Sequence, residues 1–299
     1  MVAKNTAFTM DIALFGNSYQ EKYKDQLSDL LAFLQKKNDF TLMVERDFAR
    51  YLRSLGIGVN QEWEFDRDTF TGASLAVSIG GDGTMLRNAA RLAAHDTPVV
   101  GINSGHLGYL TAGRINEASN IIESIARGEC RREQRTMLQL LEIDGKPCDN
   151  VVALNEIAIL RQDTTSMISI PTTINGTMLT TYKGDGLVIS TPTGSTAYNM
   201  SVGGPIINPS TSCLVLSPIS PHSLTMRPIV VNEDSLIEVT INTRAKWIQV
   251  SVDGMAMTLP SGTTVKIARA PYRLTVLQKN EHNFASTLRE KLLWGADQR

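Results

Sequence analysis

The stretch Leu75-Ala76-Val77-Ser78-Ile79-Gly80-Gly81-Asp82-Gly83-Thr84 decides the fold class of this 299-residue chain. Its first five residues are mostly apolar, which is typical of a buried strand, and the glycines that follow end the strand. Thr84–His95 is then expected to form a helix. A strand, a glycine turn and a helix in that order belong to a βαβ unit, so the sequence predicts a parallel sheet covered by helices.

The segments around this stretch repeat the alternation of strand and helix. Tyr19–Lys37 carries Tyr23, Leu27, Leu30, Leu31 and Leu34 at helical spacing, with polar residues between them. Gly128 follows a second helical pattern and is suited to end it as a C-cap. We therefore expect strands at Met10–Gly16, Phe40–Val44 and Pro98–Ile102, and the second helix at Ile115–Arg127.

The pattern changes after about Arg131, where segments rich in β-branched residues replace the helices. Asn175-Gly176 and Asp253-Gly254 each separate two such segments, which is a strong hairpin signal. The fold class is therefore α/β: a Rossmann-like parallel-sheet domain at residues 1–128, then a β-rich, mostly antiparallel domain at residues 129–283. A helix at Ser286–Leu293, within residues 284–299, is expected to pack back on the first domain. The expected strands are Met137–Ile143, Val151–Leu160, Met167–Ile174, Leu236–Asn242, Trp247–Val252, Met255–Leu259, Thr263–Ala268 and Tyr272–Leu277.

The composition excludes several classes of protein. A hydrophobic share of 42%, a charged share of 20% and a net charge of -1 indicate a globular protein without a nucleic-acid partner. No uncharged apolar run approaches the roughly 20 residues that span a bilayer, so no membrane association is expected. Cys130, Cys148 and Cys213 are odd in number and lack C-x-x-C spacing, which argues against disulfides and zinc. We expect buried, reduced thiols, a cytoplasmic location and no metal cage.

The glycine loop is the first candidate site. Gly80, Gly81, Gly83 and Thr84 form a phosphate loop in this interpretation, because glycines allow close approach and helix-start N–H groups favour phosphate oxygens. A carboxylate among them is unsuited to bind phosphate, so Asp82 is better explained as a base or an indirect metal anchor. The alternative is a structural role in which Asp82 only caps the helix.

Two more polar clusters interrupt apolar strand patterns. Asn155-Glu156 lies inside Val151–Leu160, where an amide and a carboxylate could bind ribose hydroxyls and a base edge. The run from Asp185 to Tyr198 ends a strand and leads through clustered hydroxyls into a short helix near Ser201. Its hydroxyls and helix-start amides could bind a polar ligand, with Tyr198 stacking on a base. The structural alternatives are an ordinary strand end and a Ser/Thr capping turn.

These three sites resemble a known motif set. Residues 80–84, Gly-Gly-Asp-Gly-Thr, are similar to the signature shared by NAD kinases and by diacylglycerol and sphingosine lipid kinases. Asn155-Glu156 and the Ser-Thr-Pro-Thr-Gly-Ser-Thr-Ala-Tyr run at residues 190–198 resemble NAD kinases alone. The resemblance extends from about Ala76 to Asp253. In that family the dinucleotide lies between an N-terminal α/β domain and a C-terminal β-rich domain.

The resemblance implies a reaction and a set of contacts. The γ-phosphoryl group of ATP would be transferred to the 2′-hydroxyl of the adenosine ribose of NAD, giving NADP, with Asp82 as catalytic proton acceptor. A divalent cation, Mg²⁺ or Mn²⁺, would help to neutralise phosphate charge. Ser166 and Met255 correspond to positions that vary among relatives. The expected NAD contacts are Asp82, Gly83, Arg87, Asn155, Glu156, Ser166, Lys183, Asp185, Thr193, Thr196, Ala197, Tyr198, Asn199, Met200, Ser201 and Met255.

The same resemblance implies a homodimer or homotetramer. Two alternatives remain open at this point. A lipid kinase could share the glycine loop, although Asn155-Glu156 and the hydroxyl-rich run disfavour it. A non-catalytic dinucleotide sensor could keep the pocket, although the presence of Asp82 disfavours that function. The sequence does not distinguish ATP from polyphosphate as donor, or NAD from NADH as acceptor.

Overall fold

The computed structural model describes residues 9–105, 108–163, 166–281 and 283–292. The chain forms two compact units, the first from residues 1–133 and 274–299 and the second from residues 134–273. The chain therefore crosses from unit to unit twice. Residues 129–133 and 274–283, which we assigned to the β-rich domain, belong to the first unit because their strands β7 and β21 extend its sheet.

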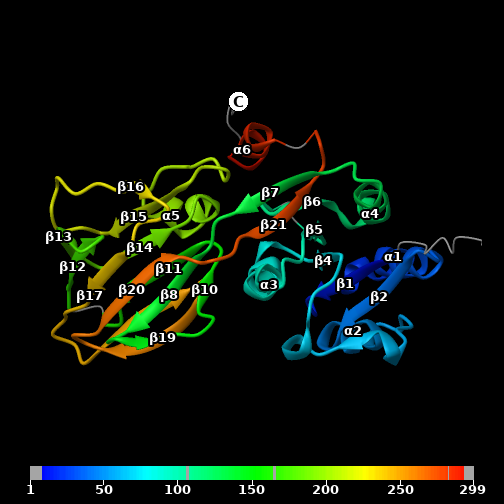
Figure 1. Ribbon diagram of the computed structural model, residues 1–299, viewed down its shortest axis with the longest axis horizontal. Helices are drawn as coiled ribbons and strands as arrows, with labels where there is room; N and C mark the ends of the chain where they lie inside the picture. The colour runs from blue at the N-terminus through cyan, green and yellow to red at the C-terminus, as the bar shows by residue number, and fades with distance from the viewer. Residues whose placement is uncertain (1–8, 106–107, 164–165, 282, 293–299) are drawn as a thin grey trace, which may run out of the picture. The chain divides into compact units, whose positions relative to one another are not determined.

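The first unit contains the sheet that the glycine loop predicted. Its strand order is β3-β2-β1-β4-β5-β21-β7, with β6 paired to β5, and β1, β2, β3, β4, β5, β6 and β21 run parallel. From β1 the chain moves to β2 on one side and later returns to β4 on the other, so the strand order reverses between β1 and β4 (Figure 1). The strands are β1 Met10–Gly16, β2 Phe40–Glu45, β3 Glu64–Phe65, β4 Leu75–Ile79, β5 Val99–Asn103, β6 Thr111–Arg114, β7 Arg131–Arg135 and β21 Leu274–Gln278.

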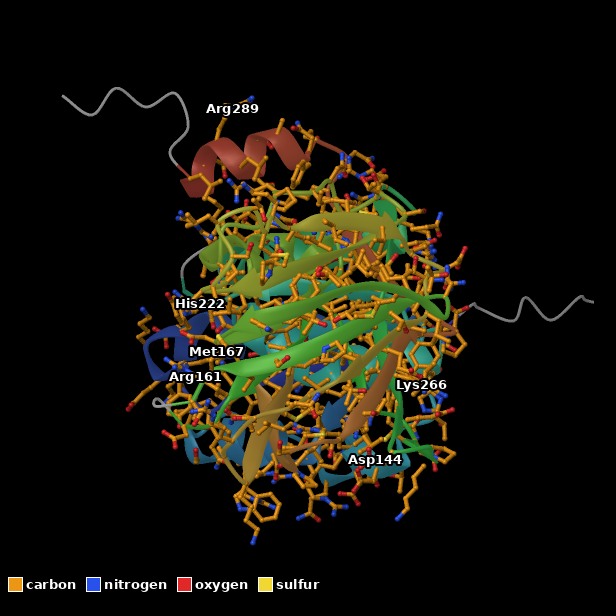
Figure 2. The ribbon with its side chains drawn as sticks, turned by 90° about the vertical axis from the view of Figure 1, so that its left-hand side faces the viewer. Asp144, Arg161, Met167, His222, Lys266 and Arg289 are labelled. Carbon is orange, nitrogen blue, oxygen red and sulfur yellow. The ribbon has the colours of Figure 1, made fainter. Side chains whose placement is uncertain are left out.

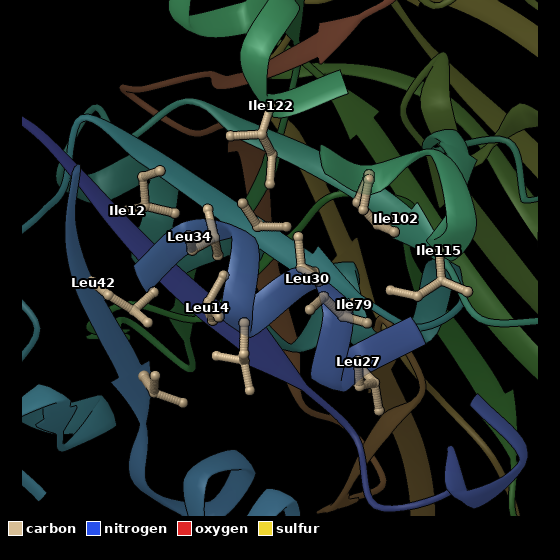
Figure 3. Packing of buried hydrophobic residues seen from close by; sticks show 14 of the residues in the cluster. Ile12, Leu14, Leu27, Leu30, Leu34, Leu42, Ile79, Ile102, Ile115 and Ile122 are labelled. Carbon is tan, nitrogen blue, oxygen red and sulfur yellow. The ribbon is translucent and has the colours of Figure 1, made fainter. Parts of the chain in front are cut away.

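Helices cover both faces of this sheet. Leucines of α1 and isoleucines of α4 pack on the face that carries Val77, Ile79, Val100 and Ile102 (Figure 3). Gly101 points to the opposite face, where a Cβ would meet the Met85 side chain of α3, so α3 lies there. The α-helices of this unit are α1 Lys24–Gln35, α2 Arg46–Ser54, α3 Asp82–Ala94, α4 Ala118–Ala126 and α6 Phe284–Leu292, with short 3-10 turns η1 Glu21–Tyr23, η2 Gln61–Trp63, η3 Arg67–Thr69 and η4 Ile115–Glu117.

The second unit is made of two antiparallel sheets. One has the order β10-β8-β20-β17-β12-β13 with β9 beside β8, and the other has the order β16-β15-β14-β11-β18-β19. One apolar core, with residues from both sheets, lies between them. The bounds are β8 Leu138–Ile143, β9 Lys146–Pro147, β10 Val152–Ala153, β11 Glu156–Arg161, β12 Ile168–Ile174, β13 Thr177–Gly184, β14 Gly186–Ser190, β15 Cys213–Ile219, β16 Ile229–Asn232, β17 Ile237–Thr240, β18 Trp247–Val252, β19 Met255–Pro260 and β20 Thr264–Arg269, with η5 Thr193–Thr196 and α5 Tyr198–Ser201.

Several expectations differ from the structure. The Tyr19–Lys37 helix starts only at Lys24, because residues 21–23 form a 3-10 turn. The expected strand Val151–Leu160 is two strands, β10 and β11, which belong to different sheets. Cys130 and Cys148 are only half-buried, whereas Cys213 is buried as expected, and all three are free thiols. Of the closing helix, residues 293–299 lie outside the described residues.

Candidate active site

The glycine loop connects the carboxyl end of β4 to the start of α3. Gly80 has φ of +147°, and a Cβ there would overlap the Thr84 hydroxyl, so the turn requires glycine. The buried Thr84 hydroxyl accepts hydrogen bonds from the Asn17 amide at 3.2 Å and from the Arg87 guanidinium at 3.3 Å. The first N–H groups of α3 have no partner inside the helix, as at every helix start, although that of Thr84 donates to the Gly81 carbonyl at 2.9 Å. The loop therefore offers donors beside the switch in strand order, where open α/β sheets bind ligands.

Asp82 does not cap its own helix. Gly81 occupies the N-cap position of α3, and the Asp82 carboxylate accepts from the backbone N–H of Tyr109 at 2.8 Å and of Leu110 at 3.1 Å. Both donors follow β5, the strand next to β4. A Cβ on Gly108 would overlap this carboxylate. The half-buried carboxylate is thus held at one orientation, and each oxygen keeps a lone pair for another partner.

Asn155-Glu156 lies at the corner where the chain passes from β10 to β11. The Asp253 carboxylate accepts from the N–H groups of Leu154 at 2.7 Å, Asn155 at 2.9 Å and Glu156 at 3.1 Å. On the carbonyl side, the Thr191 hydroxyl donates to Leu154 at 2.6 Å and the Thr191 N–H donates to Asn155 at 2.9 Å. Because the corner lies between sheets, these side chains satisfy backbone groups that a strand ladder would otherwise satisfy.

Glu156 is the most perturbed carboxyl in the second unit. Burial and the nearby Asp253 carboxylate raise its pKa to about 7, against a hydrogen bond from the Tyr198 N–H. Its Oε2 is buried and has no partner among the described residues. Burial also raises the pKa of Tyr198, and the charges of Glu156 and Asp185 add to this effect. Glu156, Tyr198 and Asp185 therefore form one polar group that could hydrogen-bond hydroxyls of a ligand.

Most polar side chains of the hydroxyl-rich run form hydrogen bonds to other groups of the protein. The Ser195 hydroxyl exchanges hydrogen bonds with the backbone of Ile207, and the buried Asn199 amide donates to Ser195 and Pro205 and accepts from Ser217. The Thr193 hydroxyl is different, because it is buried and has no partner in the described part of the chain. Thr196, Ala197, Tyr198 and Met200 are half-buried and Ser201 is exposed, so this stretch keeps accessible surface.

The remaining expected contacts lie around the β13–β14 connection. Asp185 pairs with Arg161 at 3.2 Å, and the Lys183 carbonyl accepts from the His222 N–H at 2.8 Å. Figure 2 labels Arg161, Met167 and His222 on the second unit, and Ser166, which precedes Met167 in the chain, is half-buried. The Lys183 side chain is exposed on β13. Met255 is 69% exposed and follows the Asp253-Gly254 turn.

Comparisons with known proteins extend these observations over the whole chain. Residues 12–130 match the model of the ATP-NAD kinase N-terminal domain, and residues 154–278 match that of the ATP-NAD kinase C-terminal domain. A curated NAD kinase of Bacteroides fragilis is 43% identical over 97% of this chain and 100% of its own length. The chain belongs to the NAD kinase family. The NAD kinase of Porphyromonas gingivalis is 38% identical over 95% of this chain and 98% of its own length.

Two solved structures have the same fold as this NAD kinase family member. Yeast NADH kinase, solved in complex with NADH, has a TM-score of 0.85 at 22% identity and covers 100% of this chain and 94% of its own. An NAD kinase from Archaeoglobus fulgidus, in complex with ATP, has a TM-score of 0.64 at 23% identity, with coverage of 91% and 94%. Among the described residues, no helix is both long and apolar enough to cross a membrane.

Sequence reasoning missed two parts of the site in this family member. Asp253 was interpreted only as a turn residue, and nothing in its local sequence shows that its carboxylate reaches residues 154–156. Gly108 and Tyr109 were not considered at all. A signal for them exists, because they follow the buried strand Val99–Asn103 and the carboxyl ends of neighbouring parallel strands meet at one edge.

The raised pKa of Glu156 predicts a pH dependence of stability. The folded protein keeps a proton up to about pH 7 that the unfolded chain loses near pH 4.5, so stability falls as the pH rises between these values. The full shift corresponds to about 3 kcal/mol of unfolding free energy. Glu156→Gln cannot titrate and should lose this slope in urea unfolding at pH 5, 6, 7 and 8. Asp149→Asn, at an exposed position of the same unit, should keep it, and equal slopes in Glu156→Gln and wild type would contradict the assignment.

Proposed function

We propose that this chain is an NAD kinase that transfers the γ-phosphoryl group of ATP to the 2′-hydroxyl of the adenosine ribose of NAD. Near-full-length similarity to curated NAD kinases carries the proposal. It is supported by a fixed carboxylate in the glycine loop and by the partner-free, buried Oε2 of Glu156. A lipid kinase is disfavoured, because the matched models and relatives are NAD kinases over both units.

The proposed chemistry rests on Asp82 as the proton acceptor. Its two backbone donors hold the carboxylate without neutralising it, so a lone pair stays available for the proton of an attacking hydroxyl. The N–H groups at the start of α3 would stabilise charge that develops on the phosphoryl oxygens. On the other unit, Asn155, Glu156 and Asp185 would hold the hydroxyls and base of NAD, with Tyr198 beside them. The other proposed NAD contacts are Gly83, Arg87, Ser166, Lys183, Thr193, Thr196, Ala197, Asn199, Met200, Ser201 and Met255.

A divalent cation is part of the proposal. The described residues contain no group of three or more His, Cys, Asp or Glu side chains that could hold a metal ion. This fits Mg²⁺ or Mn²⁺ that arrives with ATP, because such ions bind substrate phosphates and only one or two carboxylates. The ATP phosphates would hold the cation, and Asp82 would anchor it only indirectly, because its carboxylate is assigned to accept the hydroxyl proton. The cation would supply charge neutralisation of the phosphates.

We further propose a cytoplasmic enzyme that assembles as a homodimer or homotetramer. The three free cysteines fit a reducing compartment. β13 is an edge strand, and Met178 and Leu179 on it are exposed. An uncovered apolar edge is a common site of subunit contact.

The direct test of the function is NADP formation by the purified chain, measured in a coupled assay. NAD and NADH are compared as acceptors, and ATP and inorganic polyphosphate as donors, with diacylglycerol as the acceptor of the rival lipid kinase. Diacylglycerol phosphorylation without NADP formation would support the lipid kinase. Dinucleotide binding without turnover would support a sensor.

Asp82→Asn should lower turnover by roughly 10²- to 10⁴-fold, which is the usual contribution of a positioned base. Asparagine can accept only one of the two backbone N–H groups, so we also expect unfolding free energy to fall by about 1–3 kcal/mol. NAD affinity, measured by calorimetry, should stay close to that of wild type. Asp29→Asn, on an exposed position of α1, is the matched control, and near-normal turnover of Asp82→Asn would remove the base assignment.

Asn155→Ala and Glu156→Ala should raise the KM for NAD much more than the KM for ATP. Losing a partner of a buried ribose contact costs about 1–3 kcal/mol, or roughly 5- to 150-fold. Initial rates with each substrate varied in turn measure both constants. Asn242→Ala changes an exposed asparagine of the same unit and should leave both unchanged. If both KM values rise equally, the pair is structural.

Light scattering of the wild-type protein should give a dimer or tetramer. Asp185→Ala should weaken NAD use while the particle keeps its mass, because Asp185 lies beside Tyr198 and pairs with Arg161 within its own unit. NAD titration of both proteins completes the test. A fully active wild-type monomer would contradict the proposed assembly, and unchanged NAD kinetics in Asp185→Ala would remove that residue from the site.

A further inference from the structure

A buried glutamine, Gln20, lies beside the glycine loop in the first unit. It follows β1, precedes the 3-10 turn η1 and is 0% exposed. Its N–H donates to the Tyr51 hydroxyl of α2 at 2.8 Å, and its carbonyl accepts from the Tyr23 N–H at 2.9 Å. The backbone of Gln20 is therefore held in place, which limits the groups that its side-chain amide can reach.

The Gln20 amide contacts the peptide group at which β4 ends and the glycine loop begins. The Gly80 N–H donates to the Ile102 carbonyl of β5 at 2.8 Å. The Ile79 carbonyl belongs to the same trans peptide and points the other way, towards β1, whose pairing with β4 ends here. Nε2 of Gln20 donates to this carbonyl at 2.8 Å. The first peptide group of the loop is thus held from two sides, by β5 and by Gln20.

Asn17 extends this contact to the other end of the loop. Nε2 of Gln20 also donates to the Asn17 side-chain oxygen at 3.0 Å, and the Asn17 side-chain nitrogen donates to the Thr84 hydroxyl at 3.2 Å. Both partners of Nε2 are carbonyl oxygens, so only the nitrogen of the Gln20 amide can face them. These hydrogen bonds join Ile79, before the loop, to Thr84, after it, with Asp82 between the two.

We propose that Gln20 is a positioning residue for the phosphoryl transfer, which holds the glycine loop so that the Asp82 carboxylate meets the attacking hydroxyl. The inference rests on the proposed kinase function, because it concerns the placement of the proposed base. The N–H groups of Tyr109 and Leu110 hold the carboxylate of Asp82, whereas Gln20 and Asn17 hold the backbone on either side of it. Gln20 is fully buried and acts through the loop. A displacement of about 1 Å at a reacting group can lower a rate roughly 100-fold, so losing these hydrogen bonds should appear in turnover.

Gln20→Met keeps the length and the packing of the side chain and removes both donors. In the full-length enzyme kcat should fall about 10- to 100-fold. The KM for NAD should change by less than about threefold, because the proposed NAD contacts Asn155 and Glu156 lie on the other unit. A fall in kcat with this KM retained would not follow from a loss of folded protein stability alone.

Thr97→Val is the matched control for lost stability. Thr97 is 1% exposed, follows the far end of α3, and its hydroxyl accepts from the Ala73 N–H at 3.2 Å. Urea unfolding should show a loss of stability in both variants, with kcat kept in Thr97→Val. A fall in kcat as large as that of Gln20→Met would show that any buried hydrogen bond of this unit has the same effect, and would overturn the proposal.

A double-mutant cycle tests whether Gln20 acts through Asp82. The base is already lost in Asp82→Asn, so adding Gln20→Met should lower the remaining turnover by less than about threefold. The same 10- to 100-fold loss in both backgrounds would make the two residues independent and would also overturn the proposal.

Hydrogen exchange of the Gly80 N–H follows the loop without turnover. NMR of the full-length protein labelled at glycine should show exchange at least about 10-fold faster in Gln20→Met than in Thr97→Val. Equal exchange in these two variants, or wild-type kcat in Gln20→Met, would reject the positioning role and leave the kinase function intact. Faster exchange in Gln20→Met of a protein that forms no NADP would keep the contact with the loop and reject the kinase function.

If Gln20→Met does not fold, Tyr51→Phe carries the test. This variant removes the hydroxyl that accepts the Gln20 N–H and leaves the Gln20 amide in place. It should lower kcat by about 2- to 5-fold, as expected for one lost hydrogen bond, and speed exchange at Gly80. Wild-type kcat and wild-type exchange in Tyr51→Phe would then overturn the proposal.

Discussion

The three hydrogen bonds from residues 154–156 to the Asp253 carboxylate are the interaction on which the second unit's site depends. The chain must leave one sheet after β10 and enter the other at β11, and three successive N–H groups would lose their partners at that corner. A buried N–H without a partner costs about 1–3 kcal/mol, so the corner needs an acceptor with several lone pairs. A carboxylate meets that need. Burial of Glu156, with the charge of this carboxylate added to it, raises the pKa of Glu156, which links the fold at this corner to the protonation of the candidate site.

In the first unit, too, backbone N–H groups donate to a carboxylate, but this carboxylate keeps lone pairs for another partner. Asp82 is held by the backbone N–H groups of Tyr109 and Leu110, which follow the neighbouring strand. In the second unit the carboxylate supports the backbone, because three successive N–H groups donate to it and complete a corner. At the glycine loop the backbone supports the carboxylate, because two N–H groups of the described residues hold it and the half-buried group keeps lone pairs for another partner. Gly108 makes the approach possible, since a side chain there would occupy the position of the carboxylate.

The fold was predictable where the pattern is local. Strand, glycine turn and helix around residues 75–94 follow from short-range spacing, as do the hairpin turns at Asn175-Gly176 and Asp253-Gly254. The return of β21 to the first sheet was not predictable, because its apolar residues suit either unit and pairing with β5 is a long-range choice. The break at Leu154-Asn155 was equally hidden, since the apolar pattern runs through it. What decides it is a carboxylate about 100 residues further along the chain.

The candidate site residues fall into two groups, those whose hydrogen bonds are made within the protein and those that can still bind a ligand. Resemblance to a motif does not separate the two groups. The hydroxyl-rich run is the most recognisable motif. The side chains of Thr191, Ser195 and Asn199 nevertheless form their hydrogen bonds within the protein, mainly to backbone carbonyl groups. Such a turn requires those residue types at those positions whether or not a ligand touches them, because each satisfies a buried polar group. Among the candidate site residues, those that keep hydrogen-bonding capacity include the Glu156 carboxyl, the Thr193 hydroxyl and the Asp82 carboxylate. Unused hydrogen-bonding capacity, and not motif strength, is therefore the physical criterion that separates candidates for ligand contact from the framework that positions them.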